Sequence, residues 1–292
     1  MTQSPPVIHT GNPSLPKAVV ITGASSGIGR ACALRLDELG WQIFVGVRTQ
    51  ADAEALRQAS PRLTPLFLDV TQPDTIAASA QIVSEVVGPT GLFGLVNNAG
   101  IARGGPLEFL PIDELRRQFE VNVLGQIAVT QALLPLLRAG RGRIVNMGSI
   151  SGKIALPLLG PYAASKFALE ALTDALRIEL SFWDIHVSII EPGPINTPIW
   201  AKSLSTFETM TKAWPPQAQD LYGQAMEVVR KVINQSAQNA APVDDVVRAV
   251  IHALTVRRPK TRYPVGRWAA TTIWLFKLLP DRLRDWLIMQ RR

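Results

Sequence analysis

The chain has 292 residues, of which 47% are hydrophobic and 18% charged, as is usual for a globular protein that can bury a full core. Cys32 is the single cysteine, so an internal disulfide is excluded. The three histidines are scattered without metal-ligand spacing, and we expect no metal site. The formal net charge is +7 at pH 7, but positive charge alone does not predict a nucleic-acid partner.

Residues 1–16 are polar and rich in proline, with neither a basic start nor an apolar stretch of signal-peptide length. We therefore expect a flexible lead-in and no secretion. A free cysteine suits a reducing compartment, so the predicted location is cytoplasmic.

A glycine-rich loop follows the first predicted strand. Residues 17–22 (KAVVIT) form a β-branched run typical of a buried strand, and the segment after them has helical spacing. Gly23 permits a tight turn, Gly27 lets backbone N–H groups approach a pyrophosphate, and Gly29 lets the helix pack closely on the strand. The anion would then lie at the positive end of the helix. An ordinary strand–helix turn has the same pattern, and the remaining motifs decide between the two.

Strand-like and helical segments alternate up to residue 256, with no internal repeat, low-complexity block or domain linker. This order predicts an α/β fold, a single doubly wound Rossmann-type domain over residues 17–256 with a parallel sheet flanked by helices. Residues 257–292 are predicted to form a C-terminal helical extension.

Three polar residues in the middle of the chain suggest proton-transfer chemistry. Tyr162 and Lys166 are four residues apart in a segment with helical spacing, so their side chains project from one face. A nearby ammonium lowers a phenol's pKa from its usual value of about 10, which improves a general acid or base near neutral pH. Ser149 ends an apolar strand-like run, at the edge where open α/β sheets bind ligands.

Seven motifs together resemble the short-chain dehydrogenase/reductase family over roughly residues 17–256. In chain order they are the loop Thr22–Gly29, LDVT with Asp69, NNAG at 97–100, Asn122 in VNV, Ser149 in MGSISG, YAASK at 162–166 and EPGPINT at 191–197. The resemblance implies an oxidoreductase that transfers a hydride between a nicotinamide dinucleotide and an alcohol or carbonyl group. It also implies a homodimer or homotetramer.

The resemblance assigns a role to each of four catalytic residues. Tyr162 exchanges the proton, Ser149 polarises the carbonyl oxygen, Lys166 holds the nicotinamide ribose and lowers the pKa of Tyr162, and Asn122 holds a water. The expected cofactor contacts are Thr22, Gly23, Ser25, Ser26, Gly27, Ile28, Gly29, Arg48, Asp69, Val70, Asn98, Ala99, Gly100, Tyr162, Lys166, Pro192, Gly193, Ile195 and Thr197. The expected substrate contacts are Ser149, Ile150, Tyr162, Ile199 and Trp200.

The end of the second predicted strand bears on the choice of cofactor. NAD-binding proteins usually carry an acidic residue there to accept hydrogen bonds from the ribose 2′-OH. Here Val47 stands at that position and Arg48 follows it, which suits a 2′-phosphate. A second basic residue, frequent within the loop of NADP-binding members, is replaced by Ser26. We expect NADP(H) to be preferred, with NAD(H) as the alternative.

Residues of about 195–240 are expected to cover the substrate. The stretch from Ile199 to Met226 is apolar and aromatic, which suits a hydrophobic alcohol or carbonyl compound, although a helix pair in the core would have the same composition. The GVRT strand end, the YAASK helix and the long basic tail resemble the retinol and hydroxysteroid dehydrogenase branch. That resemblance implies a retinoid-, steroid- or other lipid-like substrate.

The segment 257–292 holds ten Lys or Arg against two Asp, and several tryptophans. Its longest apolar run, WAATTIWLF, has nine residues and is too short to span a bilayer. Pro280 should separate two short helices, with Leu283, Trp286 and Leu287 on one face of the second. This face either packs on the protein's own body or contacts an anionic membrane surface.

Two other classes of function are compatible with parts of the sequence. A catalytically silent nucleotide-binding regulator would keep the glycine loop, but the intact set of Asn122, Ser149, Tyr162 and Lys166 argues against it. A peripheral membrane scaffold would depend on the tail, and the complete cofactor motifs argue against that as the main role.

Overall fold

The computed structural model describes residues 17–289 except residues 213 and 239. The predicted flexible lead-in, residues 1–16, lies outside the described residues. Several side chains of the helices that follow residue 198 are also outside them, among them the predicted substrate contact Trp200.

A seven-stranded sheet forms the centre of the molecule, in the order β3-β2-β1-β4-β5-β6-β7 with every pair parallel. The strands are β1 (Ala18–Ile21), β2 (Gln42–Val47), β3 (Thr64–Phe67), β4 (Gly94–Asn97), β5 (Arg143–Met147), β6 (His186–Pro192) and β7 (Arg262–Val265). The order reverses beside β1, as in a doubly wound Rossmann-type sheet. The predicted fold class is confirmed.

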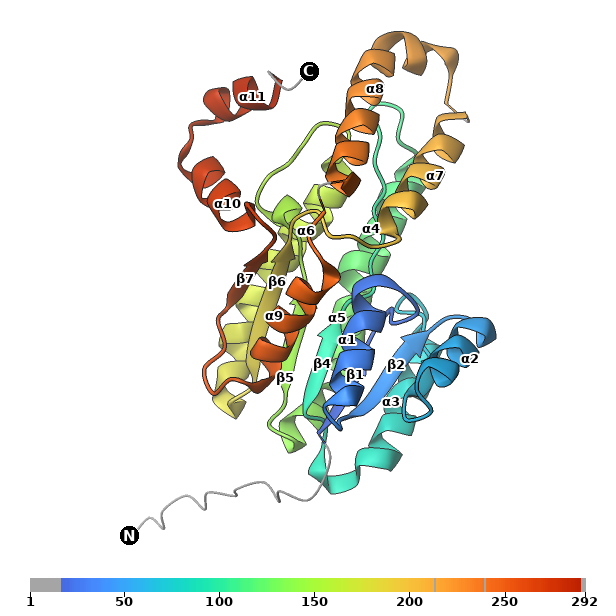
Figure 1. Cartoon of the computed structure of the whole chain (residues 1–292), viewed down its shortest axis with the longest axis vertical. Helices are drawn as coiled ribbons and strands as arrows, with labels where there is room; N and C mark the ends of the chain where they lie inside the picture. The colour runs from blue at the N-terminus through green and yellow to red at the C-terminus, as the bar shows by residue number, and fades with distance from the viewer. Residues whose placement is uncertain (1–16, 213, 239, 290–292) are drawn as a thin grey trace.

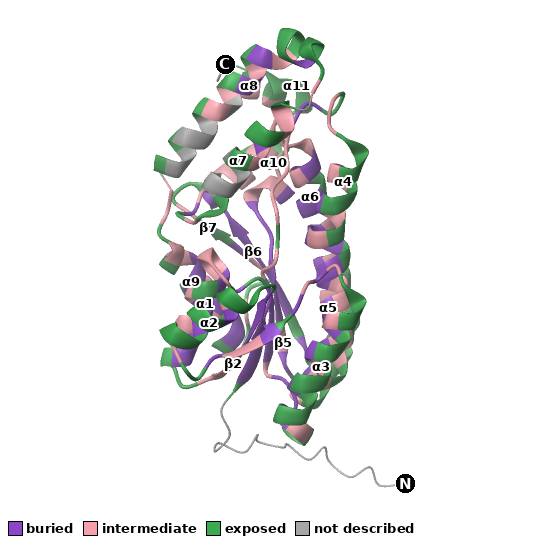
Figure 2. Ribbon diagram, turned by 90° about the vertical axis from the view of Figure 1, so that its right-hand side faces the viewer, coloured by how far each residue is buried: buried purple, intermediate pink, exposed green. Residues whose placement is uncertain are grey.

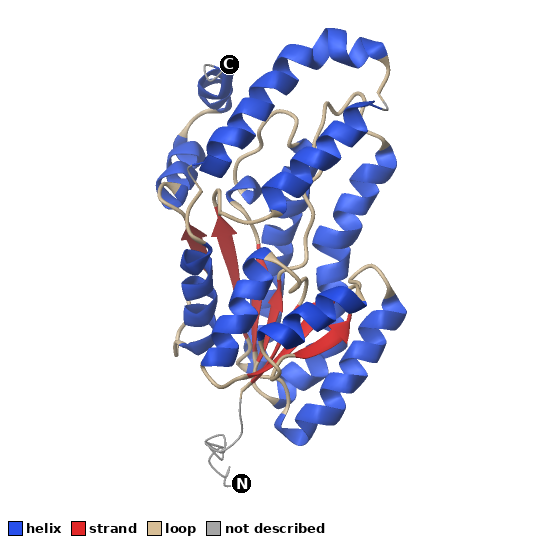
Figure 3. Cartoon of the chain, turned by 45° about the vertical axis from the view of Figure 1, so that its right-hand side comes forward, coloured by secondary structure: helices blue, strands red, loops and turns tan. Residues whose placement is uncertain are grey.

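Helices cover both faces of the sheet, as Figures 2 and 3 show. They are α1 (Gly27–Glu38), α2 (Gln50–Ala59), α3 (Pro73–Val87), α4 (Ile112–Phe119), α5 (Gly125–Ala139), α6 (Gly160–Glu179), α7 (Ile199–Lys212), α8 (Pro216–Gln238), α9 (Val243–Thr255), α10 (Ala269–Leu278) and α11 (Asp281–Met289). Helices α1, α2 and α9 lie on one face, and α3, α5 and α6 on the other. Helices α7 and α8 extend beyond the carboxyl ends of the strands (Figure 1).

The core has two apolar layers because successive residues of a strand point to opposite faces. In β1, Val19 and Ile21 pack under α1 and α9, whereas Ala18 and Val20 pack under α3 and α5. All four residues of β1 are buried, as expected for a central strand of a parallel sheet.

One polar pair interrupts these apolar layers. Asn97 and Asn146 are opposite each other in the register of β4 and β5, and each is 1% exposed. The Asn97 amide donates to Asn146 Oδ1 at 3.0 Å and to Thr130 Oγ1 at 2.9 Å. The Asn146 amide donates to Thr173 Oγ1 at 2.9 Å, so the chain of hydrogen bonds runs from α5 across two strands to α6.

The segment 257–292 differs from the expected helical extension in its first part. Residues Arg262–Val265 form β7, the edge strand of the sheet, because their backbone pairs with β6 from Ile189 to Pro192. The helical part begins at Ala269. The division of the chain at residues 16 and 256 stays a proposal.

One helical stretch among the described residues, Ile112–Ala139, is long and apolar enough to cross a membrane by length and composition. Of the most apolar 18 consecutive residues in this stretch, 44% are buried within the protein. Val129, Leu133 and Leu137 of this stretch belong to the core under α3, so packing on the sheet explains its apolar character.

Candidate active site

The glycine loop between β1 and α1 has the backbone that its sequence predicts. Gly23 and Gly27 have φ angles of +62° and +57°, in the left-handed region that favours glycine. A Cβ at Gly23 would lie 2.8 Å from Ala99 Cα, and one at Gly29 would lie 2.6 Å from the Gly23 carbonyl oxygen. Gly23 is therefore required by both conformation and space, and Gly29 by space.

The first turn of α1 fits an anionic cofactor. Ser26 is the N-cap residue, yet its side chain makes no capping hydrogen bond, and the first turn holds no acidic residue. The N–H groups at a helix start need acceptors, and a phosphate at the positive helix end supplies them. A pyrophosphate suits this loop, with Ser25, Ser26 and Ile28 around it. Thr197 approaches the same loop, since a Cβ at Gly27 would lie 3.4 Å from its Cβ.

The predicted NNAG motif is tied to the glycine loop. Thr22 Oγ1 accepts hydrogen bonds from the N–H groups of Asn98 (3.0 Å) and Ala99 (2.9 Å). The Asn98 amide donates in return to the Thr22 and Gly23 carbonyls, at 2.9 and 3.0 Å. These residues join the ends of β1 and β4 into one unit, so Asn98 shapes the loop through its side chain.

Arg48 and Asp69 follow β2 and β3 at the carboxyl edge of the sheet. Burial raises the pKa of Asp69, but hydrogen bonds from Thr71 and the charges of Arg48 and Arg117 together hold it below its usual range. Asp69 Oδ1 accepts from the Thr71 N–H at 2.9 Å, and Val70 beside it is buried. Arg48 is exposed, and no ion pair within 4.0 Å joins it to a described residue. Its guanidinium is therefore available to a ligand.

Asn122 lies in a π-helical turn, Glu120–Leu124, between α4 and α5. Such turns often occur at functional sites because they redirect a side chain out of the regular helix. Asn122 Oδ1 accepts from the Ile101 N–H at 2.9 Å, and its amide donates to the Ile101 carbonyl at 2.9 Å and to Ser165 Oγ at 3.1 Å. The side chain holds the segment after Gly100 against α6, and its predicted water stays a prediction.

Sequence reasoning missed two glutamines that support the same segment. Gln118 donates to the Ile101 carbonyl and accepts from the Arg103 N–H, both at 2.7 Å. Gln126 donates to the Ala99 carbonyl at 3.2 Å. Both side chains are buried, Gln118 on α4 and Gln126 on α5. A polar residue on the buried face of a predicted helix was the available signal.

Ser149, Tyr162 and Lys166 meet at the carboxyl end of β5. Ser149 Oγ accepts from the Ser151 N–H at 3.1 Å and lies 3.5 Å from the Pro192 carbonyl. Lys166 is 4% exposed, and its Nζ donates to the Met147 carbonyl at 2.7 Å. The same Nζ lies 5.8 Å from the centre of the Tyr162 ring. The four predicted catalytic residues are thereby brought together with Gly100, where a Cβ would lie 3.4 Å from Asn122 Oδ1 and 3.9 Å from Lys166 Nζ.

The electrostatics of this cluster differ from the expectation. Burial raises the pKa of Tyr162, and a hydrogen bond with Ser149 opposes that rise. The expected lowering of the pKa of Tyr162 by Lys166 is wrong for this structure, because the ammonium is directed to the Met147 carbonyl. Burial lowers the pKa of Lys166 itself to about 8, against the charge of Glu170. The phenol is therefore protonated at neutral pH.

The EPGPINT motif lies directly beyond β6. The Gly193 N–H donates to the Val265 carbonyl of β7 at 2.8 Å. A Cβ at Gly193 would lie 3.9 Å from Ile150 Cδ1, so the predicted substrate contact Ile150 lies beside this loop. Ile195 is buried and forms an isolated bridge with Ala241. Pro192 contacts Ser149 through its carbonyl, 3.5 Å from Ser149 Oγ.

The predicted cover corresponds to α7 and α8. Phe207 and Trp214 pack edge to face with ring centres 6.0 Å apart, as do Phe109 and Tyr222 at 5.8 Å. Tyr222 donates to Glu108 Oε2 at 2.8 Å. These contacts join the cover to the segment before α4, above the catalytic residues. Ile199 is 39% exposed at the start of α7.

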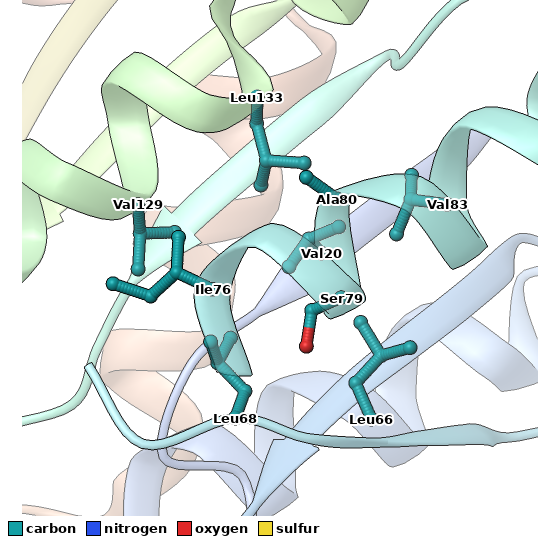
Figure 4. A pocket seen from close by; sticks show the side chains of 9 residues that line it. All are labelled: Val20, Leu66, Leu68, Ile76, Ser79, Ala80, Val83, Val129 and Leu133. Carbon is teal, nitrogen blue, oxygen red and sulfur yellow. The ribbon is translucent and has the colours of Figure 1, made fainter. Parts of the chain in front are cut away.

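Two cavities lie away from this cluster. One, of about 10 Å³, is a packing gap between α3, α5 and the sheet, lined by apolar residues and Ser79 (Figure 4). It is too small for more than a water. The other, of about 330 Å³, is lined by Arg177, His186 and Thr261 near the amino end of β6, opposite the catalytic residues. Neither is the substrate site.

Comparison with known proteins agrees with this geometry. Residues 17–207 match the short chain dehydrogenase family. Retinol dehydrogenase 5 of Mus musculus is 44% identical over 279 residues, covering 91% of this chain and 86% of that protein. For 17-beta-hydroxysteroid dehydrogenase type 6 of Bos taurus the identity is 38%, covering 93% and 87%. An NADPH-dependent 3-dehydrocapnine reductase of Ornithobacterium rhinotracheale is 36% identical, covering 91% and 94%.

Solved structures show the same fold. A short chain dehydrogenase of Burkholderia cenocepacia in complex with NADP has a TM-score of 0.70 and 26% identity, covering 92% of this chain and 94% of that one. A short chain dehydrogenase/reductase of Burkholderia phymatum in complex with NAD has a TM-score of 0.75 and 25% identity, covering 95% and 96%.

The sheet order, the glycine loop and the cluster at the carboxyl edge define a Rossmann-type, nicotinamide-dinucleotide-dependent oxidoreductase acting on CH–OH groups. The chain belongs to the short-chain dehydrogenase family, in the branch of the retinol and hydroxysteroid dehydrogenases.

Proposed function

We propose that this protein interconverts a hydrophobic alcohol and its carbonyl compound with NADP(H), and that Tyr162 is its general acid and base. The observation that carries the proposal is the convergence of Ser149, Tyr162 and Lys166 at the sheet edge that also holds the glycine loop. When bound, the nicotinamide supplies or accepts the hydride.

The protein's own residues perform the remaining tasks. Tyr162 gives a proton to the substrate oxygen during reduction and takes it back during oxidation, while the Ser149 hydroxyl donates a hydrogen bond to the same oxygen. Lys166 is buried, with its Nζ 5.8 Å from the centre of the Tyr162 ring, and would hold the nicotinamide ribose. Asn122 fixes the segment after Gly100 against α6.

A panel of hydrophobic alcohols and carbonyl compounds assayed with both cofactors tests the proposal. Retinoid and steroid substrates come first, because two of the relatives are named retinol and 17-beta-hydroxysteroid dehydrogenases. The buried Phe207 and Met226 of α7 and α8 support an apolar substrate under the cover. Absence of turnover with every compound that the related enzymes use, or turnover that survives the loss of Tyr162, would contradict the proposal.

The preference for NADP(H) is supported by Arg48. It is exposed at the end of β2 and close enough to Asp69 to lower the pKa of that carboxyl. A guanidinium at this edge suits a ribose 2′-phosphate, which it can bind through two parallel hydrogen bonds. The name of the 3-dehydrocapnine reductase, NADPH-dependent, agrees with this preference.

Arg48→Asp is expected to lower the ratio of kcat/KM with NADPH to that with NADH by about 10- to 100-fold, the equivalent of one charge-assisted hydrogen bond of about 1.5 to 3 kcal/mol. The carboxylate also repels the 2′-phosphate. Arg57→Asp makes the same charge change on an exposed residue of α2 and is the control, with an expected change below about twofold. An unchanged ratio in Arg48→Asp would remove Arg48 from cofactor recognition.

The helices α10 and α11 support contact with an anionic membrane surface. Trp268, Trp274 and Trp286 are 66, 64 and 52% exposed, so more than half of the surface of each is open to solvent. Arg267 and Lys277 lie beside the tryptophans in sequence. Tryptophan with neighbouring cations is typical of segments that lie in the membrane interface.

Replacing Trp274 and Trp286 with Ser in the full chain is expected to weaken flotation with phosphatidylserine-containing vesicles at least about tenfold, the equivalent of about 1.4 kcal/mol. The control is Phe182→Ser, since Phe182 is 86% exposed and lies outside the tail. Wild-type flotation should need anionic lipid and weaken with salt. Equal flotation of all three proteins would exclude the tail as the contact.

A further inference from the structure

Two buried carboxyl groups belong to a cluster of charged side chains on α6, β6 and β7. Glu170 of α6 is 5% exposed and Glu191 of β6 is 1% exposed. Lys153 Nζ lies 2.6 Å from Glu170 Oε2 and 3.6 Å from Glu191 Oε1. Arg262 of β7 makes the corresponding contacts at 3.1 and 3.6 Å, and a third one to Asp174 at 2.6 Å. Arg177 also pairs with Asp174 at 3.1 Å, so three carboxyl groups face three cations.

Two oxygens of this cluster have no hydrogen-bond donor among the described residues. They are Glu170 Oε1 and Glu191 Oε1, and both are buried. A buried acceptor without a donor costs about 1 to 3 kcal/mol. A proton shared between the two carboxyl groups provides that donor. Both carboxyl groups contact Lys153 and Arg262 and so share one site, where one of the two carboxyl pKa values is raised.

The titration of the pair agrees with this geometry. Burial raises the pKa of Glu191 to about 7, with further contributions from the hydrogen bond and charge of Glu170, and the charges of Lys153 and Arg262 only partly oppose it. The pair thus holds its shared proton below neutral pH and releases it to solvent above.

The pair is joined to the segments that carry Lys166 and Ser149. Glu170 is one helical turn beyond Lys166, and its charge raises the pKa of Lys166 against the effect of burial. Glu191 immediately precedes Pro192, whose carbonyl lies 3.5 Å from Ser149 Oγ. Lys153 follows the turn Ile150–Gly152 that Ser149 caps.

We infer that Glu170 and Glu191 share one proton and act as positioning residues that set the charge state of Lys166. Loss of the shared proton adds a second negative charge to the pair, which favours the ammonium form of Lys166. The effect on catalysis rests on the proposed function, since Lys166 acts there beside Tyr162. The charged groups around the pair are Lys153, Lys166, Asp174 and Arg262, with Arg177 paired to Asp174.

Carbon-13 NMR of the full-length protein labelled at glutamate carboxyl groups tests the shared proton directly. Wild type should show a carboxyl that titrates near pH 7, and Glu191→Gln should lack it, because an amide keeps the shape and donates a hydrogen bond but does not ionise. Asp174→Asn is the matched control, since it removes an ion-paired carboxylate on α6 and leaves the pair intact. The titration should persist in that control.

The coupling to Lys166 is measured by NADPH affinity between pH 6 and 10. In Glu170→Gln and Glu191→Gln the pH at which affinity falls by half should drop by about half to one unit relative to wild type, because the ammonium loses a nearby negative charge. Asp174→Asn should move it by less than about 0.2 unit. Glu191→Gln alone keeps the test valid if Glu170→Gln does not fold.

The pH dependence of the free energy of unfolding gives an independent test of the raised pKa of Glu191. The pKa of Glu191 is raised from 4.5 to about 7 in the folded protein. The folded state then binds more protons than the unfolded state in this window, so wild type should lose stability relative to Glu191→Gln as pH rises from about 4.5 to about 7.

Three results would overturn the inference, and none of them depends on turnover. They are the absence of a carboxyl titrating between about pH 6 and 8, its persistence in Glu191→Gln, and an unchanged midpoint for NADPH in both variants. A carboxyl titration with no movement of that midpoint makes the pair purely structural. Failure of the proposed function is a separate outcome: the wild type shows no turnover, or its turnover does not depend on Tyr162. Neither result changes the NMR titration.

Discussion

Tyr162→Phe is expected to lower kcat by about 10²- to 10⁴-fold, the range typical of general acid–base catalysis, while NADPH affinity changes by less than about threefold. The substitution removes only the hydroxyl that Ser149 contacts. The glycine loop, Asn98 and Arg48 do not touch it. Steady-state kinetics and NADPH fluorescence titration measure the two quantities separately.

The control for this experiment is Tyr222→Phe. Tyr222 loses a hydrogen bond to Glu108 on the cover, at 2.8 Å, but lies outside the proton-transfer cluster. Its kcat should stay within about threefold of wild type, because one exposed hydrogen bond is worth about 1 kcal/mol or less. Tyr162→Phe activity above a tenth of wild type would show that another group transfers the proton.

Gly23→Ala is expected to lower NADPH affinity at least about 100-fold. An alanine in the left-handed backbone conformation of Gly23 costs roughly 1 to 2 kcal/mol. Its Cβ would also lie 2.8 Å from Ala99 Cα. Thr22 and Asn98 join the glycine loop to the NNAG segment, so relief of the clash requires these two segments to move apart. Isothermal titration with NADPH measures the loss.

Gly88→Ala separates these two causes. Gly88 has a φ of +52°, similar to the +62° of Gly23, but a Cβ there meets nothing within 4 Å. It should lower the thermal unfolding temperature through backbone strain and leave NADPH affinity within about twofold. Similar losses of affinity in both variants would mean that the effect of Gly23→Ala is general destabilisation.

The fold and the cofactor loop follow from local sequence patterns. The β-branched run before Gly23 and the helical spacing after it predict strand, loop and helix, and the structure has β1, a loop with two left-handed glycines, and α1. Tyr162 and Lys166 are four residues apart on one helix, so their proximity also follows from spacing. Such patterns involve residues close in the chain.

Features that depend on distant segments could not be predicted in the same way. The sequence predicts a helical tail where β7 lies. A strand of four residues gives too short a pattern to be recognised, and its pairing partner in β6 lies some seventy residues earlier. The raised pKa of Tyr162 depends on burial, which the helix pattern does not give. Glu191 carried an overlooked signal, an acidic residue at the end of an apolar strand.

The buried amide pair Asn97 and Asn146 fixes the register of β4 against β5. If β5 shifted by one residue, Asn146 would point into the opposite apolar layer and both amides would lose their partners, at about 1 to 3 kcal/mol for each unsatisfied group. The residues just beyond these strands include Asn98 and Ser149. The buried amides therefore keep Asn98, on the cofactor side of the active site, at a constant distance along the sheet from Ser149, on the proton-transfer side.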